Sequence, residues 1–142
     1  MALRPSLELA IALPFQIDAY GTILATVDQS KIWADRVRSV IGTAIGERIY
    51  RPEFGCAAAF KLFETEETTV TLVQDDIRRA FISFLPLCRL DETIVSVDEI
   101  NRIINVEVIY TTPTAEQYAL EVAIATINGT DPISEEITWR PL

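Results

Sequence analysis

Apolar side chains recur at helical spacing in two separate stretches of the chain. The first stripe comprises Trp33, Val37, Val40, Ile41 and Ala44, and the second comprises Val73, Ile77, Ala80, Phe81 and Phe84. Asp28 or Ser30 can cap the first helix, because a short side-chain oxygen accepts hydrogen bonds from free backbone amides. The second helix is expected to begin near Thr68 or Thr69 and to end before Pro86. The pattern therefore predicts two amphipathic helices that pack on a sheet.

Alternation of apolar and polar residues predicts strands in the last third of the chain. The expected strands cover residues 93–97, 103–110 and 118–126, and the linker Thr111–Gln117 is short enough to join antiparallel neighbours. The positions expected on one face are Ile104, Val106, Val108 and Tyr110, followed by Tyr118, Leu120, Val122 and Ile124. Residues 7–28 predict two short extended segments broken near Asp18–Gly21. Residues 133–139 predict one more strand, after a turn at 128–132.

The order of these elements predicts an α+β fold, a mostly antiparallel sheet with two main helices packed on one face. The chain has 142 residues, of which 49% are apolar and 23% charged, as is usual for a single globular domain. We expect one domain over residues 1–142. Residues 1–27 would form N-terminal strands and residues 127–142 a C-terminal extension.

Charge and residue types argue against several classes of function. The net charge of −9 disfavours binding to nucleic acid or to an anionic membrane, because both need clustered Lys and Arg, whereas it suits a basic protein partner. The absence of histidine removes histidine-dependent nucleophilic catalysis and the commonest transition-metal ligand. Cys56 and Cys88 are too few for a disulfide framework or a structural zinc site. We therefore expect a soluble protein, cytosolic or assembled, with no cofactor, no metal and no membrane span.

The segment "GERIYRPEFGC", residues 46–56, is a dense polar cluster between the two predicted helices and is here termed the elbow. Pro52 favours extended backbone before it, Gly55 permits a sharp turn, and Phe54 can staple the loop to the core. The charged members, whose arginine forks suit carboxylates within easy reach, are Glu47, Arg48, Arg51 and Glu53. Two interpretations stay open: an internal ion-pair network that orders the loop, and an arginine-bearing surface for a protein partner.

One enzymatic option remains in principle. A glycosidase needs only two carboxylates at a suitable separation, one of them with a raised pKa. The candidate groups are Glu47 with Glu53, or Glu64 with Glu66 and Glu67. Any acidic protein offers such pairs, so they carry little weight by themselves.

Several separated pieces of the chain agree in order and spacing with a known family. The matching positions form a Gly-x-Arg-x-x-x-Pro-x-Phe-Gly segment and a Leu-Phe-Glu piece: Gly46, Arg48, Pro52, Phe54, Gly55, Leu62, Phe63 and Glu64. From about Ser30 to Thr126 the chain resembles the baseplate wedge and sheath-initiator proteins of contractile phage tails, a family that reaches into type VI secretion and other contractile injection systems. Members often carry Glu-Pro-Arg after the second helix. This chain has Leu87, Cys88 and Arg89 there, so only the arginine remains.

The resemblance implies a structural role without catalysis, although the family has also been labelled lysozyme-like. Such proteins lie in a six-fold arrangement at the inner baseplate, near the tail tube or hub. They touch the baseplate wedge proteins and template the first ring of the tail sheath protein. The expected location is therefore the virion tail baseplate, and the host cytoplasm during assembly. Arg89 is expected at a wedge contact, paired with Glu47 or Glu53.

The expected means of sheath initiation is strand addition, because an exposed sheet edge offers unpaired amide and carbonyl groups to a partner strand. The candidate edges are residues 117–126 and the tail segment 133–139. The candidate sheath-contact residues are Tyr118, Leu120, Val122, Ile124 and Trp139. Three alternatives stay open: the same role in another injection machine, a tail-associated peptidoglycan hydrolase, and a small adaptor for one regulatory partner.

Overall fold

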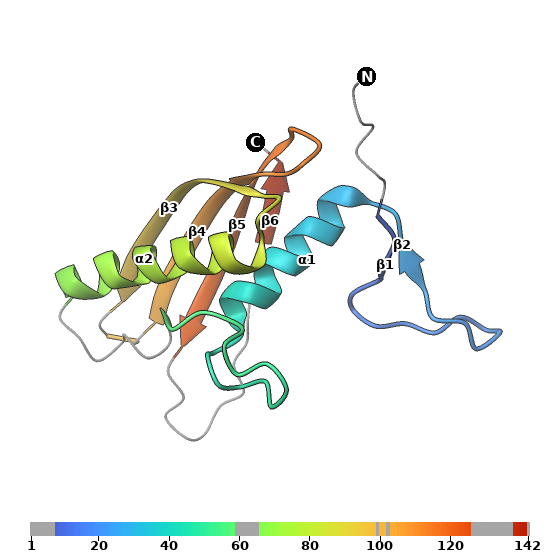
Figure 1. Cartoon of the computed structure of the whole chain (residues 1–142), viewed down its shortest axis with the longest axis horizontal. Helices are drawn as coiled ribbons and strands as arrows, with labels where there is room; N and C mark the ends of the chain where they lie inside the picture. Colours follow the sequence, from blue (N-terminus) through green and yellow to red (C-terminus); the bar gives the residue numbers. More distant parts are fainter. Residues whose placement is uncertain (1–7, 59–65, 99, 102, 126–137, 142) are drawn as a thin grey trace.

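The computed structural model describes residues 8–58, 66–98, 100–101, 103–125 and 138–141, and shows two helices across one face of an antiparallel sheet (Figure 1). The helices are α1 (Gln29–Gly42) and α2 (Glu66–Phe84), and the main sheet comprises β3 (Arg89–Asp98), β4 (Ile103–Thr111), β5 (Gln117–Ala125) and β6 (Thr138–Pro141). Two short strands, β1 (Ala10–Ile11) and β2 (Ala25–Thr26), form a separate sheet. The predicted α+β fold is confirmed.

Both helices form where the apolar stripes predict them. Asp28 caps α1, because its carboxylate accepts hydrogen bonds from the amide and hydroxyl of Ser30 at 3.1 and 2.7 Å. The second helix begins at Glu66, slightly earlier than predicted, and ends at Phe84, close to Pro86. Neither helix, as far as the structure describes the chain, is long and apolar enough to cross a membrane. The sequence "AAAFKLFE", residues 57–64, also predicts a short helical piece, and most of it lies outside the described part.

The main sheet has the order β3-β4-β5-β6, and each pair of neighbours is antiparallel. The register places Val106 of β4 between Val95 of β3 and Val122 of β5, so the apolar positions of the three strands share one face. The predicted tail strand is found at Thr138–Pro141, whereas residues 133–137 are not among those described. Its neighbour is β5, which therefore lies inside the sheet rather than at its edge.

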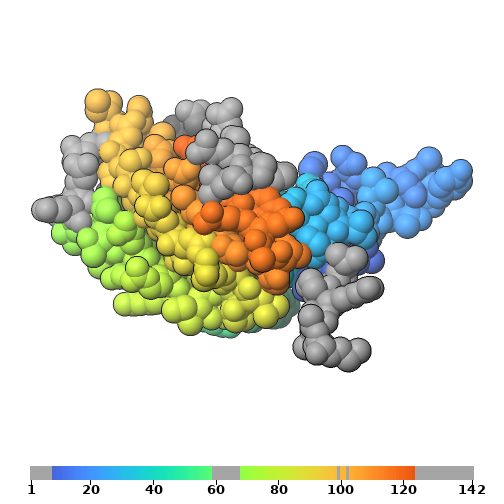
Figure 2. All heavy atoms as spheres, turned by 90° about the horizontal axis from the view of Figure 1, so that it is seen from above, coloured from blue at the N-terminus to red at the C-terminus, as the bar shows by residue number. Residues whose placement is uncertain are grey.

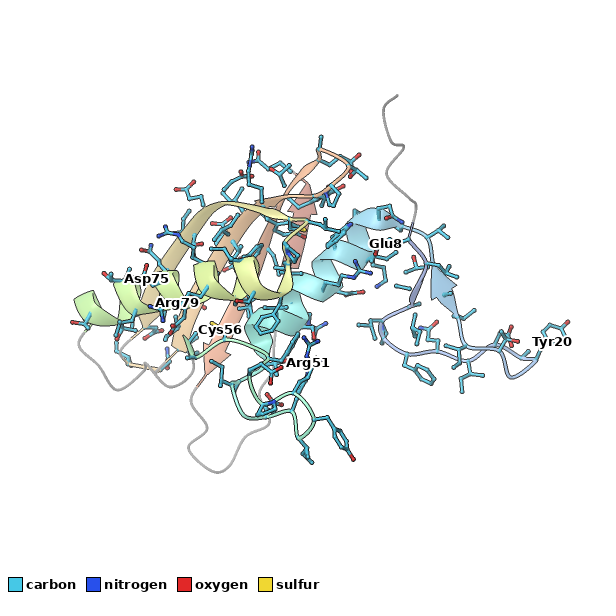
Figure 3. The ribbon with its side chains drawn as sticks, in the orientation of Figure 1. Glu8, Tyr20, Arg51, Cys56, Asp75 and Arg79 are labelled. Carbon is cyan, nitrogen blue, oxygen red and sulfur yellow. The ribbon has the colours of Figure 1, made fainter. Side chains whose placement is uncertain are left out.

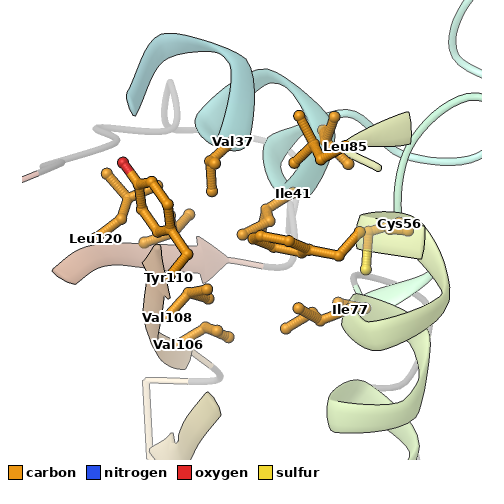
Figure 4. Close-up of a cluster of buried hydrophobic side chains, with 14 of the residues drawn as sticks. Val37, Ile41, Cys56, Ile77, Leu85, Val106, Val108, Tyr110 and Leu120 are labelled. Atoms are coloured by element: carbon orange, nitrogen blue, oxygen red, sulfur yellow. The ribbon is translucent and has the colours of Figure 1, made fainter. Parts of the chain in front are cut away.

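A single core fills the space between the helices and the sheet (Figure 4). Val37 and Ile41 of α1 and Ile77 of α2 point at Val108 and Tyr110 of β4. The fully buried side chains include Ile32, Val37, Val73, Ile77, Ile104, Val106, Val108, Tyr110, Leu120 and Val122. At about 1.5–3 kcal/mol for each large apolar side chain, this burial is the main force that holds the helices on the sheet.

The N-terminal segment forms a hairpin here termed the arm, residues 8–27. Its ladder is short: Ala10 pairs with Thr26 and Ile11 with Ala25, and an isolated bridge joins Ile17 and Ile23. The predicted break near Asp18–Gly21 is confirmed as the hairpin turn. The arm is not part of the main sheet, and it extends away from the body of the molecule (Figures 1 and 2).

Candidate functional site

The elbow starts just after the end of α1, and its chain comes back to the same place. Backbone hydrogen bonds join its two halves at the base and again further out. The amide of Cys56 donates to the carbonyl of Thr43 at 2.9 Å, and Ala44 and Cys56 form a parallel bridge. Further out, the amide of Gly46 donates to the carbonyl of Pro52 at 2.8 Å. The loop is thus an ordered projection with its own hydrogen bonds.

Two glycines make this path possible. Gly46 has φ 88° and Gly55 has φ 116°, backbone conformations that other residues rarely adopt. At Gly55 a Cβ atom would lie 2.2 Å from the carbonyl oxygen of Thr43, whereas a Cβ at Gly46 would meet nothing within 4 Å. Gly55 therefore serves both the turn and the close approach of two backbone segments.

Phe54 fastens the elbow to the core, as predicted. It is 8% exposed, and its ring lies 4.9 Å from the ring of Phe84 at the end of α2. The guanidinium carbon of Arg48 lies 3.9 Å from the centroid of the Phe54 ring, and that of Arg51 lies 5.9 Å from the Phe54 and Phe84 rings. Cations placed over aromatic faces are held there by the ring quadrupole. The two arginines thus cover the aromatic pair.

The charged side chains of the elbow make fewer ion pairs than the residue types suggest. Arg51 pairs with Glu53 at 3.5 Å, with both side chains more than half exposed. Arg48 instead donates to the hydroxyl of Ser39 at 2.9 Å, and a carboxylate oxygen of Glu47 accepts from the amide of Ala44 at 2.9 Å. Exposed pairs contribute at most about 1 kcal/mol. Backbone hydrogen bonds and the Phe54 staple, rather than an ion-pair network, therefore order the elbow.

The tip of the elbow carries two residues that the sequence reasoning passed over. Ile49 is 89% exposed and Tyr50 is 97% exposed, and both lie between the two arginines. The sequence did contain a signal for them. Ile49 and Tyr50 are large apolar residues in a loop of glycine, proline and charged residues, and they belong to no periodic pattern that would place them in a core. An aromatic next to arginines is typical of protein-binding surfaces.

The expected pairing of Arg89 with Glu47 or Glu53 is wrong. Its Nε donates to a carboxylate oxygen of Asp91 at 2.7 Å, two residues further along β3. A bulge between Leu90 and Glu92 makes this possible, because it leaves Asp91 out of the ladder. The side chain of Arg89 remains 76% exposed. Its contact is local, and it adds nothing to the elbow.

Most of the expected sheath-contact residues face the core. Tyr118 is 6% exposed and Leu120 and Val122 are each 1% exposed, under the helices, so their side chains cannot meet a partner. The edge expected at residues 117–126 is also occupied over Tyr118–Glu121, which pair with β6. The side chains of Ile124 and Trp139 belong to the part that the structure does not describe.

The carboxylates proposed for glycoside hydrolysis do not form a site in the described residues. Glu47 and Glu53 are exposed on the elbow and engaged locally, and Glu64 and the side chains of Glu66 and Glu67 are not described. Among the described side chains there is no group of three potential metal ligands. Burial raises the pKa of the Cys56 thiol to about 11, so it is protonated at neutral pH and is a poor nucleophile or ligand.

Comparisons with known proteins agree with this geometry. A crystal structure of a Geobacter sulfurreducens protein, provisionally named a tail lysozyme, shares the fold with a TM-score of 0.62 and 24% sequence identity. The match covers 76% of this chain and 99% of that one. A search of curated proteins gave no significant match. The family model for baseplate wedge protein gp25 matches residues 29–124, a span that contains both helices, the elbow, β3, β4 and nearly all of β5. On that match, the chain belongs to the gp25 family of phage-tail baseplate wedge proteins.

Proposed function

We propose that the chain joins wedge proteins of a contractile tail baseplate and initiates polymerisation of the tail sheath, without catalysing a reaction. The observation that carries this proposal is the family match over residues 29–124, which spans the elbow. Partner contact requires an ordered surface, and the elbow supplies one. A rigid loop loses little conformational entropy on binding, so more of the contact energy contributes to affinity.

The elbow is the proposed wedge contact. The side chains of Ile49 and Tyr50 at its tip are almost fully exposed, and Arg48 and Arg51 flank them in the sequence. Figure 3 labels Arg51 on this loop. Tyrosine and arginine are the residue types that contribute most often to interface hot spots. Both arginines are held in place by contact with Phe54, so their donors are oriented before a partner arrives.

The proposed sheath contact is the edge of the main sheet at β6. The two edges of that sheet are β3 and β6. The β3 edge carries Arg89, Asp91, Glu92 and the bulge, features that hinder the approach of another strand. A strand of the sheath subunit could complete the β6 edge.

Sheath initiation is tested by co-expression with the neighbouring sheath protein, followed by size-exclusion chromatography and electron microscopy. We expect a complex, or sheath-like rings that form only when this chain is present. A chain that ends at residue 137 keeps every described residue of the core cluster, so it should fold, but it should lose the rings. If full-length and shortened chains both fail to bind sheath and wedge proteins while the full chain clears a peptidoglycan suspension, the structural proposal is wrong and a hydrolase must be considered.

The wedge contact is tested separately with Tyr50→Ser. This side chain is almost fully exposed, so its loss should leave the melting temperature unchanged. We expect affinity for the wedge protein to fall by about tenfold or more, as for a typical interface tyrosine. The matched control is Ile82→Ser on α2, which also removes an exposed apolar side chain. Equal affinity of both variants and the wild type would remove the elbow from the wedge contact.

A further inference from the structure

The arm lies outside the residues matched by the family model, and it projects from the body. In Figure 3 Tyr20 lies at its far end, well beyond the helices and the sheet. In the space-filling view of Figure 2 the arm forms a narrow extension beyond α1. Its two-stranded ladder has only two residues on each side, and an isolated hairpin of this kind is marginally stable in water.

The arm exposes an unusual amount of apolar surface. Its exposed large apolar residues are Leu9, Ile11, Leu13, Phe15, Ile17, Tyr20, Ile23, Leu24 and Val27, with exposed fractions from 39% to 94%. A large apolar or aromatic residue carries on the order of 200 Å² when fully exposed. The arm therefore presents on the order of 1,000 Å², whereas one side of a standard protein interface buries about 800 Å². That total includes Tyr20, Leu24 and Val27, which do not belong to the stripe defined below, so the stripe alone supplies part of a standard interface.

The apolar residues are patterned rather than scattered. Large apolar side chains occupy every second position in Leu9, Ile11, Leu13, Phe15 and Ile17, and the residues between them are small or polar. The backbone is not extended throughout, because it bends at Leu13 and Pro14, and Ala12 and Gln16 both hydrogen-bond to Leu24. Alternation therefore places Leu9 with Ile11, and the bridge places Ile23 beside Ile17, while Leu13 and Phe15 lie in the bulged stretch between them. These six exposed residues form an apolar surface along the arm, here termed the apolar stripe.

The base of the arm is fixed to α1, which orients the stripe. The side chain of Gln29 donates to the carbonyl of Glu8 at 2.8 Å and accepts from its amide at 3.3 Å. The carboxylate of Glu8 pairs with Arg36, and the ammonium of Lys31 donates to the carbonyl of Leu13. The stem is therefore oriented on the body, while the stripe stays exposed to solvent.

The charges of the arm indicate what kind of surface could cover the stripe. Its charged residues are Glu8 and Asp18. Glu8 is paired with Arg36, and Asp18 accepts from the amides of Tyr20 and Thr22 at 2.8 Å each. Both carboxylates are thus engaged within the chain. A partner surface therefore needs no charge to match these two carboxylates. Charged side chains in a groove that covered the stripe would lose their water without gaining an ionic partner.

A second copy of this chain is a poor occupant. Three hollows in its described surface are lined in part by charged residues: Lys31, Asp35 and Arg38 in one, Arg78, Asp91 and Glu92 in another, and Glu53, Asp76 and Arg79 in the third. None of the three suits an apolar stripe. Two copies, each with a net charge of −9, would also repel each other, and the same charge disfavours an anionic lipid surface.

We propose that the arm docks its apolar stripe in an uncharged apolar groove of a different protein subunit. The identification of that subunit as a wedge protein of the same assembly rests on the proposed function. The arm and the elbow are then two separate contact surfaces on one chain.

The test is binding of the full chain to each wedge protein encoded beside it, combined with hydrogen exchange. Phe15→Ser with Ile17→Ser removes part of the stripe, and Ile82→Ser with Leu87→Ser removes exposed apolar side chains elsewhere as the matched control. All four side chains are more than half exposed, so both double variants should keep the wild-type melting temperature. We expect slowed exchange over residues 8–27 in one wedge complex. That complex should be weakened about tenfold or more by the arm variant, and left unchanged by the control.

The other outcomes overturn the inference. If every wedge complex keeps its affinity in the arm variant and residues 8–27 exchange at the free rate, the arm is not a docking element. A dimer of the chain, or binding to lipid vesicles, that the arm variant abolishes would assign the stripe to another occupant. Loss of binding in Tyr50→Ser together with unchanged binding in the arm variant would reject this inference and leave the proposed function intact. Absence of any complex with wedge or sheath proteins would reject both.

Discussion

Replacing Gly55 by alanine tests whether the elbow depends on close approach of its backbone to the end of α1. The new Cβ would lie 2.2 Å from the carbonyl oxygen of Thr43, which accepts the amide of Cys56. The positive φ costs about 1–3 kcal/mol for a residue other than glycine. Displacement of the carbonyl weakens a backbone hydrogen bond worth about 1 kcal/mol. Together these effects should destabilise the fold by about 2–4 kcal/mol.

The measurement is thermal and urea unfolding, with Gly46→Ala as the matched control. Gly46 also has a positive φ, but its Cβ would meet nothing within 4 Å, so only backbone strain is expected. That strain should be about 1 kcal/mol, the lower end of the range, because a φ of 88° lies nearer the left-handed helical value than the 116° of Gly55. The melting temperature should fall by roughly 6–12 °C for Gly55→Ala and by about 3 °C for Gly46→Ala. Equal losses in the two variants would refute the reasoning, because backbone strain alone would then explain both.

Three further predictions concern single side chains. Asp28→Ala should cost about 1 kcal/mol in urea unfolding, because it removes the cap of α1, whereas Asp28→Asn should retain most of the stability. Burial raises the pKa of the Cys56 and Cys88 thiols to about 11, so a thiol reagent at neutral pH should react with neither in the folded chain and with both in urea. The pKa of Asp91 lies below its ordinary 3.8, chiefly because the Thr111 hydroxyl donates a hydrogen bond to the carboxylate. The charged carboxylate therefore stabilises the fold above pH 3.8, and this stabilisation is lost as the pH falls through the lowered pKa. Asp91→Asn should therefore lower the melting temperature at neutral pH and reduce its fall on acidification; an unchanged acid profile would contradict this assignment.

The sequence predicted which segments form helices and strands better than it predicted which segments lie side by side. Side chains of period 3.6 and period 2 identified both helices and the strands, since those periods follow from backbone geometry alone. Alternation also identified the apolar positions of β5. Alternation could not show that the helices cover the apolar face of β5. Nor could it show that β5, which pairs with β4 along one edge, pairs with β6 along the other edge over Tyr118–Glu121. The sheath-contact prediction failed at Tyr118, Leu120 and Val122 for that reason.

Contacts of the arginines were predicted least well. A guanidinium can reach any nearby carboxylate, so the residue types allowed Arg89 several partners. The bulge at Asp91 decided among them, and a bulge leaves no mark in the pattern of apolar residues. At the elbow, the path of the backbone brings Arg48 to Ser39 and to the ring of Phe54. The glycines predicted a turn there, but not which side chains the turn would bring together.

The arrangement of the exposed apolar residues suits a connecting protein. Single exposed apolar side chains are ordinary on protein surfaces and need no explanation. In this chain many of them gather at two projections, the tip of the elbow and the arm, which leave α1 at its opposite ends. A helix that packs on the sheet through Val37, Val40 and Ile41 holds the bases of both projections rigidly. A contact made at one projection would thereby fix the direction of the other, as the proposed joining of wedge proteins requires.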